Sequence, residues 1–93
     1  QGIETWPNGY IYEGEFQNGR FHGHGIWTSK AGKQYIGQFK NGSKNGNGVL
    51  KKVDGSVYKG NFKNGLFHGK GTYTYPNKKV YSGEFKNGKI IKN

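Results

Sequence analysis

The sequence predicts an all-β fold, an elongated and twisted antiparallel sheet of successive β-hairpins in a single layer, similar to a solenoid. Three observations predict it. Aromatic residues and glycines recur with a period of 23 residues, the repeat contains segments of period-two alternation, and no window of 12 residues lacks a glycine. A period of about 20–50 residues is typical of repeat arrays, alternation is typical of strands, and frequent glycine disfavours helices.

The repeat is defined by three columns of residues. Tyrosine recurs every 23 residues, a glycine follows two residues later, and a phenylalanine follows four residues later. These positions are Tyr12, Gly14, Phe16, Tyr35, Gly37, Phe39, Tyr58, Gly60, Phe62, Tyr81, Gly83 and Phe85. Because an Asn-Gly dipeptide follows in every copy as well, chance does not explain the pattern.

The chain is therefore expected to form one domain, a repeat array over residues 1–93. It divides into a half unit 1–11, the complete units 12–34, 35–57 and 58–80, and a terminal half unit 81–93. Gly2 aligns with Gly25, so the sequence starts within a repeat, and we expect further repeats upstream.

The first strand of each unit is predicted by its alternation. Residues 10–16 place Tyr, Tyr, Gly and Phe on one face and Ile, Glu and Glu on the other, which is a strand pattern rich in aromatic residues. A glycine inside a strand lowers its stability. We therefore expect an aromatic ring from a neighbouring strand to lie across each of these glycines.

The second strand of each unit is predicted by the same alternation, as in residues 71–75, where Tyr alternates with β-branched Thr after a glycine. Residues 64–69, between the two strands, are expected to form a loop because Asn and Gly tolerate positive φ. Tighter turns are expected between the units, where Pro, Asn, Asp and Gly gather. These turns are residues 7–9, 31–33, 53–55 and 76–78.

Residues 12–25 (YEGEFQNGRFHGHG) and 58–77 (YKGNFKNGLFHGKGTYTYPN) resemble the MORN repeat, the membrane occupation and recognition nexus. Its pattern is Tyr-x-Gly-x-Phe/Trp-x-x-Gly-x-x-x-Gly-x-Gly, and the resemblance extends over essentially the whole chain. The middle unit departs most. Residues 42–46 lack the Phe-His pair of the neighbouring units, and Leu50 replaces the aromatic ring of the second strand.

The resemblance implies several functions. MORN arrays form elongated sheets that dimerise, hold a partner helix or peptide in a groove, or serve as assembly platforms in cytoskeletal and ciliary structures. The family also includes junctional membrane proteins and phosphoinositide kinases, which implies a membrane role, and MORN repeats precede lysine methyltransferase domains.

The sequence is strongly basic, with 15 Lys+Arg against 5 Asp+Glu and a formal net charge of +10. Lysines that recur at the period should form a row along the array, and paired lysines lie at or beside the turns. These candidates for contact with anionic lipid are Lys40, Lys63, Lys86, Lys51, Lys52, Lys78 and Lys79. The row could contact an anionic membrane or an acidic protein, or could equally be a solubilising surface that protects sheet edges. Nucleic acid is the least favoured partner, because Arg, the usual residue for reading base edges, occurs only once.

Aromatic residues form a second candidate surface, because a single-layer sheet cannot bury both of its faces against itself. Partly open aromatic side chains are typical of protein interfaces. The candidates for protein interaction are Phe21, Trp27, Phe67 and Tyr73. Alternatively, rings of successive units stack on one another and only stabilise the sheet.

Candidates for catalysis and metal binding are weak. The chain has no cysteine, and no serine has a histidine at a matching repeat position. Glu13 and Glu15 share a solvated strand face that offers no pocket, and His22, His24 and His68 lack a carboxylate partner at metal-ligand spacing. We therefore expect no catalytic residue, no metal and no cofactor.

The favoured function is a non-enzymatic MORN-repeat scaffold for protein–protein interaction or assembly, whose partner is another protein chain or a second copy of itself. The alternative is a peripheral membrane module that binds anionic phospholipids or phosphoinositides through its lysine rows. Because the sequence shows no signal peptide and no long apolar stretch, we expect an intracellular, cytoplasmic location, with association to the cytoskeleton or a membrane.

Overall fold

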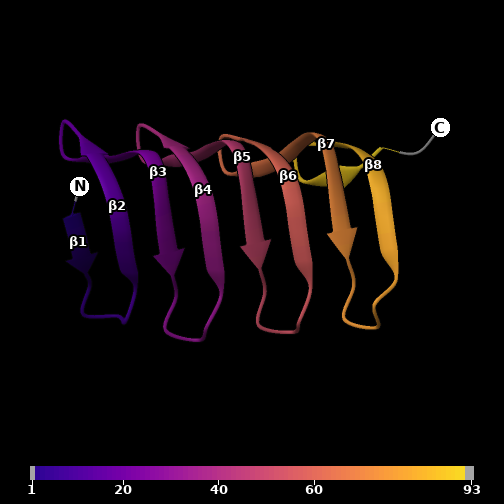
Figure 1. The fold of residues 1–93 in the computed structure, drawn as a ribbon, viewed down its shortest axis with the longest axis horizontal. Coiled ribbons are helices and arrows are strands. Elements are labelled where there is room, and N and C mark those ends of the chain that lie inside the picture. The colour runs from indigo at the N-terminus through magenta and orange to yellow at the C-terminus, as the bar shows by residue number, and fades with distance from the viewer. Residues whose placement is uncertain (1, 92–93) are drawn as a thin grey trace.

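A computed structural model describes residues 2–91 as one open sheet of nine strands, in which each strand pairs antiparallel with the next one in the chain (Figure 1). The strands are β1 (Gly2–Thr5), β2 (Ile11–Gln17), β3 (Arg20–Thr28), β4 (Gln34–Lys40), β5 (Ser43–Lys51), β6 (Val57–Lys63), β7 (Leu66–Thr74), β8 (Val80–Lys86) and β9 (Lys89–Ile90). The outermost residues of the expected half units, 1 and 92–93, lie outside the described residues.

The predicted all-β, single-layer architecture is confirmed. The described part of the chain measures 41 × 24 × 16 Å along its principal axes, so the sheet is elongated in the direction in which the hairpins follow one another. Within residues 2–91 there is no helix of the length and hydrophobicity needed to cross a membrane.

The prediction of the connections was wrong in their relative lengths. The expected loop 64–69 is a two-residue turn at Asn64 and Gly65, and β7 already begins at Leu66. Asn64 has φ 51° and Gly65 has φ 83°, as a type I′ turn requires, and this turn matches the twist of the flanking strands. The connections between units are the longer ones, such as residues 29–33 between β3 and β4.

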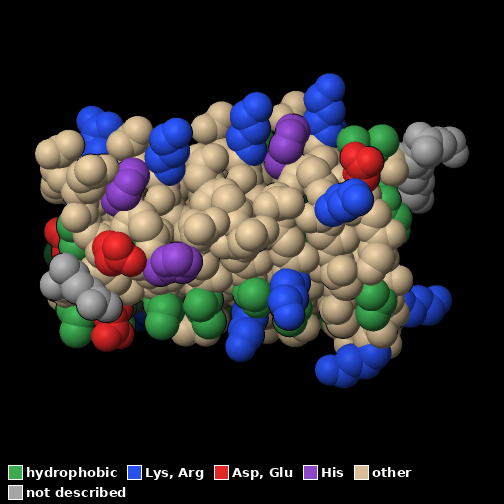
Figure 2. All heavy atoms as spheres, turned by 45° about the horizontal axis from the view of Figure 1, so that its top comes forward, with side chains coloured by type: hydrophobic (Ala, Val, Ile, Leu, Met, Phe, Trp, Pro, Cys, Tyr) green, Lys and Arg blue, Asp and Glu red, His purple; other side chains and the backbone are tan. Residues whose placement is uncertain are grey.

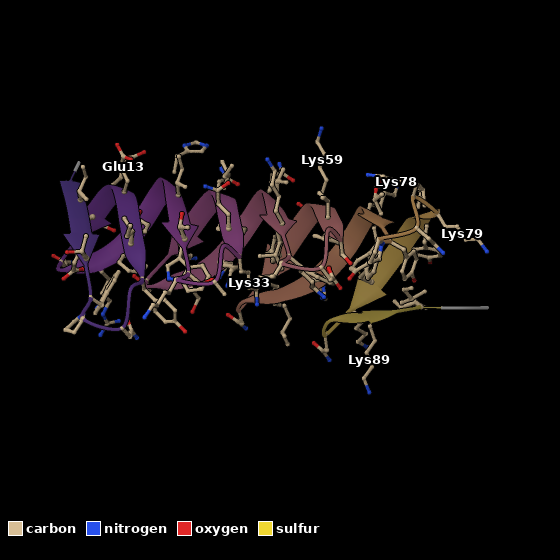
Figure 3. The ribbon with its side chains drawn as sticks, turned by 90° about the horizontal axis from the view of Figure 1, so that it is seen from below. Glu13, Lys33, Lys59, Lys78, Lys79 and Lys89 are labelled. Atoms are coloured by element: carbon tan, nitrogen blue, oxygen red, sulfur yellow. The ribbon has the colours of Figure 1, made fainter. Side chains whose placement is uncertain are left out.

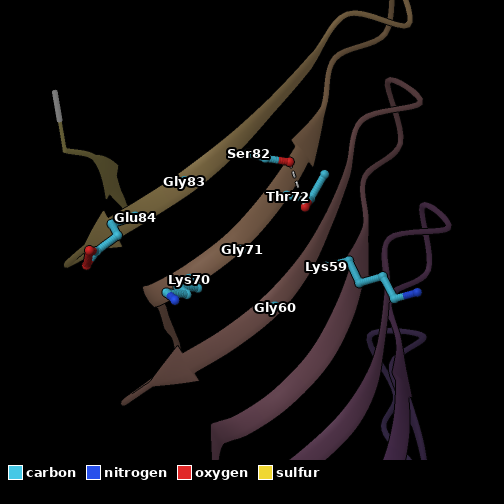
Figure 4. Close-up of a pocket in the computed structure, with 8 residues that line it drawn as sticks. All are labelled: Lys59, Gly60, Lys70, Gly71, Thr72, Ser82, Gly83 and Glu84. Atoms are coloured by element: carbon cyan, nitrogen blue, oxygen red, sulfur yellow. Dashed lines mark hydrogen bonds between the residues drawn. The ribbon is translucent and has the colours of Figure 1, made fainter.

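A β-bulge inside each complete unit bends the strands. Gly14 pairs with Gly25, but Phe16 pairs with Phe21, so β3 carries extra residues opposite β2. Gly23 lies in this stretch with φ +73°, a conformation that glycine adopts at no steric cost. Extra residues on one strand increase its local bend and twist, and the curvature of the strands is plain in Figure 4.

Glycines face glycines across eight consecutive strands at the centre of the sheet. This glycine row consists of Gly2, Gly14, Gly25, Gly37, Gly48, Gly60, Gly71 and Gly83, each opposite the next in the register. The ring of Tyr12 lies across Gly25, where an added Cβ would be 2.6 Å from the ring. Gly48 and Gly71 lie under Tyr35 and Tyr58 in the same way. At Gly14, Gly37 and Gly60 the facing backbone is the closest obstacle to a side chain.

The core lies on the face that carries the tyrosine columns, here called the inner face. Its buried hydrophobic residues are Tyr12, Tyr35, Phe39, Leu50, Tyr58, Phe62 and Phe85. Tyr12 contacts Phe16 and Phe21, beyond the glycine row, with ring centroids 5.0 and 3.8 Å away. Residues four apart on one face of a flat strand lie about 13 Å apart, so the sheet bends toward the inner face and the rings lean over the glycines.

Candidate functional site

The opposite face of the sheet, here called the outer face, carries a shallow groove along the glycine row. Three adjoining hollows of about 250, 350 and 460 Å³ follow one another from β2 to β8. Neighbouring hollows share Gly37 and Gly60, so they form one continuous groove with a floor of glycine backbone.

One wall of the groove is apolar along its N-terminal half. Ile26 lies opposite Ile36, and Ile36 opposite Val49, in the register of β3, β4 and β5. Ile26 is 37% and Ile36 38% exposed although both are large and apolar. Figure 2 shows hydrophobic side chains in such a row. The side chains of Ile26, Ile36 and Val49, here called the isoleucine row, lie outside the aromatic core.

The same wall becomes polar and basic toward the C-terminus. Val49 is followed across the sheet by Lys59, then Thr72 and Ser82, whose hydroxyl oxygens lie 3.0 Å apart. Lys59 and Glu13 point away from the same side of the sheet in Figure 3. Figure 4 shows the C-terminal hollow, with Lys59 on one side of the glycine row and Lys70 on the other.

Comparison with known proteins agrees with this repeat geometry. A family model described as MORN repeat matches residues 1–9, 12–34, 35–57, 58–80 and 81–90. The chain belongs to the MORN-repeat family. The MORN repeat is a non-catalytic repeat module of the kind that mediates interactions. No curated protein was found that matches the chain.

The aromatic residues predicted to form an interaction surface lie on the inner face of the MORN array. Phe21 stacks on Tyr12 at 3.8 Å and Phe67 stacks on Tyr58 at 3.9 Å. Trp27 and Tyr73 are half-buried beside the core as well. Stacking between rings therefore accounts for much of their surface, and their role in protein interaction stays a prediction.

The isoleucine row was missed by sequence reasoning, although the sequence contained the signal. Ile26 and Val49 directly follow the row glycines Gly25 and Gly48, and Ile36 directly follows Tyr35. Side chains alternate between the faces of a strand, so these residues had to lie opposite the tyrosine face. The aliphatic row is therefore predictable from the alternation once the face of the tyrosines is known.

The predicted lysine row is present at one long edge of the MORN array. Lys40, Lys63 and Lys86 are the last residues of β4, β6 and β8 and are exposed. Figure 2 shows Lys and Arg side chains at intervals along this edge. Lys51, Lys78 and Lys79 are exposed too. Their contact with lipid stays a prediction.

Lys52 differs from the other lysines of the predicted set. Its ammonium donates a hydrogen bond to the hydroxyl of Tyr73 at 3.0 Å. It also lies 5.8 Å from the ring centroid of Phe67 and 5.2 Å from that of Tyr73. The structure thus places Lys52 against inner-face aromatic rings and not in the lysine row.

Glu15 and His24 contact each other across β2 and β3. Glu15 Oε2 accepts a hydrogen bond from the backbone N–H of His24 at 3.1 Å and lies 3.9 Å from its Nδ1 atom. Nδ1 of His22 and of His68 is buried and has no hydrogen-bond partner within the described chain. Among residues 2–91, no three His, Asp or Glu side chains lie close enough together to hold a metal ion.

Proposed function

We propose that this MORN array is a non-enzymatic scaffold that holds a helical segment of a protein partner in the outer-face groove. The isoleucine row is the observation that supports the proposal. The aromatic residues of the inner face already form the core, so the exposed side chains of Ile26 and Ile36 do not stabilise it. Apolar side chains in a row beside a groove are typical of docking surfaces.

A helix fits the spacing of the groove. Neighbouring strands lie about 4.8 Å apart, and a helix advances about 5.4 Å per turn. A helix that crosses the strands therefore presents about one turn to each strand. Aliphatic residues at positions i, i+4 and i+7 would face Ile26, Ile36 and Val49 in succession.

The charged residues at the C-terminal end of the groove indicate which residues the second half of the bound helix should carry. Lys59 and Lys70 border the hollow that follows the isoleucine row, together with one carboxylate, Glu84, opposite Lys70 on β8. A helix with aliphatic residues first and acidic residues one or two turns later would place carboxylates beside these ammonium groups. Charge complementarity of this kind fixes register and orientation.

The proposal is tested by selecting binders from a displayed library of random 12-residue peptides against the whole chain. We expect enriched peptides to combine aliphatic residues at helical spacing with acidic residues. Ile36→Glu should weaken their binding about tenfold or more, since it places a carboxylate in the apolar wall. Val53→Glu is the matched control, because Val53 is 65% exposed but lies in a turn. Equal loss in both variants, or no selected peptide, contradicts the proposal.

A second candidate function is binding to an anionic membrane through the lysine row. The supporting observation is that Lys40, Lys63 and Lys86 repeat at one edge, about 10 Å apart given two strands per unit. Each basic residue near such a surface contributes about 1 kcal/mol. Flotation with vesicles containing phosphatidylserine and phosphoinositides tests this. Binding that persists at ~150 mM salt and is lost in the triple Lys→Glu variant supports it, and binding only at low salt rejects it.

A further inference from the structure

A separate hollow lies on the inner face, in the middle of the array. It is a cleft of about 280 Å³ lined by Phe21, Trp27, Phe39, Gly42, Ser43, Lys44 and Gly65. Lys44 stands in the same repeat column as Phe21 and Phe67. In the neighbouring units this column carries a ring that stacks on Tyr12 or on Tyr58.

The cleft exists because two large side chains are absent at the same place. Trp6 contacts Phe21 with ring centroids 5.6 Å apart. Two periods after Trp6, Lys52 covers Phe67 in the same way, with its ammonium 5.8 Å from the ring centroid. The corresponding pair in the middle of the array is Ser29 and Lys44. A small Ser thus stands at the repeat position of the covering side chain, and the cleft lies beside Lys44.

The ammonium of Lys44 is half-buried without an anionic partner. It lies 5.4 Å from the ring centroid of Trp27 and 5.6 Å from that of Tyr35. The structure gives it no ion pair within residues 2–91. Its charged neighbour is Lys33, and burial together with the charge of Lys33 lowers the pKa of Lys44.

Lys52 shows how a comparable lysine is satisfied. Its ammonium also lies over two rings, but it donates a hydrogen bond to Tyr73 at 3.0 Å. It has the carboxylate of Asp54 nearby, whose pKa is lowered by the Ser56 N–H and, less strongly, by Lys52. Lys44 thus differs from Lys52 in having a second positive charge where Lys52 has a negative one.

We propose that the Lys44 cleft binds a carboxylate that is carried on an apolar group. The ammonium of Lys44 donates a hydrogen bond to the carboxylate, Lys33 adds a second positive charge, and the apolar group packs against Trp27 and Phe21. Hydrogen bonds between charged groups are about twice as strong as those between neutral groups. The cleft lies on the face opposite the isoleucine row, so this proposal does not depend on the outer-face function.

Phenylacetate is a suitable probe, with phenylacetamide as its neutral isostere. Binding is followed by the NMR shift of the Lys44 Cε–H groups, assigned by their loss in Lys44→Met, with the Lys52 signals as internal reference. We expect a saturable shift at Lys44. Phenylacetamide should bind at least roughly tenfold more weakly than phenylacetate. Lys44→Arg should retain binding because it keeps the charge.

Matched variants separate the site from a general basic surface. Lys44→Met keeps the aliphatic stem and should abolish binding, detected by the shift of the Trp27 indole N–H signal, whereas Lys52→Met should leave binding unchanged. Lys44→Phe restores the residue of the neighbouring units, and should abolish binding while raising the thermal midpoint. The proposal is overturned if no shift saturates, if phenylacetamide binds as tightly as phenylacetate, or if Lys44→Met still binds.

The source of the carboxylate is distinguished by a second ligand in the same titration. A capped peptide with one Glu between two aliphatic residues is compared with phenylacetate and with the same peptide carrying Gln. Tighter binding of the Glu peptide than of phenylacetate assigns the cleft to an acidic protein side chain. Tighter binding of phenylacetate assigns it to a free aromatic acid, and equal binding of the Gln and Glu peptides overturns the role of the charge.

Discussion

The hydroxyl of Tyr35 donates a hydrogen bond to the backbone carbonyl of Gln38 at 2.7 Å. The tyrosine side chain thereby reaches across Gly37 and contacts the strand three residues further on. Tyr12 and Tyr58 make the same contact to Glu15 and Asn61 at 2.7 and 2.8 Å. One geometry thus links the tyrosine column, the glycine row and the bend of every complete unit.

Removal of this hydroxyl should destabilise the sheet. Tyr35→Phe keeps the ring but leaves the part-buried carbonyl of Gln38 without this donor, and should lower the free energy of unfolding by about 1–2 kcal/mol. Urea denaturation measures it. Tyr81→Phe is the control, since the Tyr81 hydroxyl makes only exposed, long contacts, 3.5 Å to the carbonyl of Glu84 and 3.3 Å to that of Ile91. Similar losses in both variants would show that the hydrogen bond is not what matters.

Stability should fall at high pH because of the buried tyrosines. Burial raises the pKa of Tyr35 to about 12 from an ordinary value of about 10, and burial also raises the pKa values of Tyr12 and Tyr58. Because the pKa of Tyr35 is higher in the folded state, its contribution to the free energy of unfolding is complete below pH ~10. This contribution is lost as the pH rises to about 12. Urea midpoints across this range should decline by less in Tyr35→Phe than in the native chain, and parallel curves would refute the assignment.

Within the glycine row, Gly37 should tolerate no side chain. A Cβ at Gly37 would lie 2.5 Å from the Cα of Gly48 and 2.6 Å from the carbonyl oxygen of Asn47, and backbone atoms cannot move aside cheaply. We expect Gly37→Ala to cost about 3 kcal/mol or more. Gly65→Asn is the control, because nothing lies within 4 Å of that position and Asn tolerates positive φ. A near-native thermal midpoint for Gly37→Ala would contradict the packing described above.

The bulge of the third unit lacks a hydrogen bond that the first two units make within the described residues. Gln38 Oε1 accepts a hydrogen bond from the backbone N–H of Asn47 at 2.9 Å, and Glu15 does the same for His24. Asn61 occupies this column in the third unit, where its shorter side chain makes no such bond to the N–H of Lys70 within the described residues. Asn61→Gln should raise the unfolding free energy by about 1 kcal/mol, with Gln38→Asn as the opposite change. A drop in the denaturation midpoint of Asn61→Gln would reject this role.

The fold was predictable because its determinants recur in the sequence. Tyr12, Gly14 and their counterparts identify strands and register wherever the period repeats. The lengths of the connections were not predictable from composition alone. Asn64 and Gly65 form a complete turn, and the next glycine, Gly69, belongs to a strand, yet both kinds of glycine look alike in sequence.

The candidate sites were harder to predict than the fold because they depend on what the repeat leaves uncovered. Ile26 and Ile36 are recognised only after the tyrosine face is known to be full. Lys44 is recognised only when its column is compared with Phe21 and Phe67, and when Ser29 is seen to replace a larger covering residue. Such sites arise from differences between repeats, whereas periodicity reveals only what the repeats share.

The most direct test of the account is an NMR titration of the native chain, labelled at Ile and Val methyl groups, with a peptide selected as described above. We predict that the signals of Ile26, Ile36 and Val49 shift together and saturate, while those of Val53 stay unchanged. If the peptide binds but the methyl signals of Ile26 and Ile36 do not move, the assignment of the outer-face groove as the docking surface is contradicted.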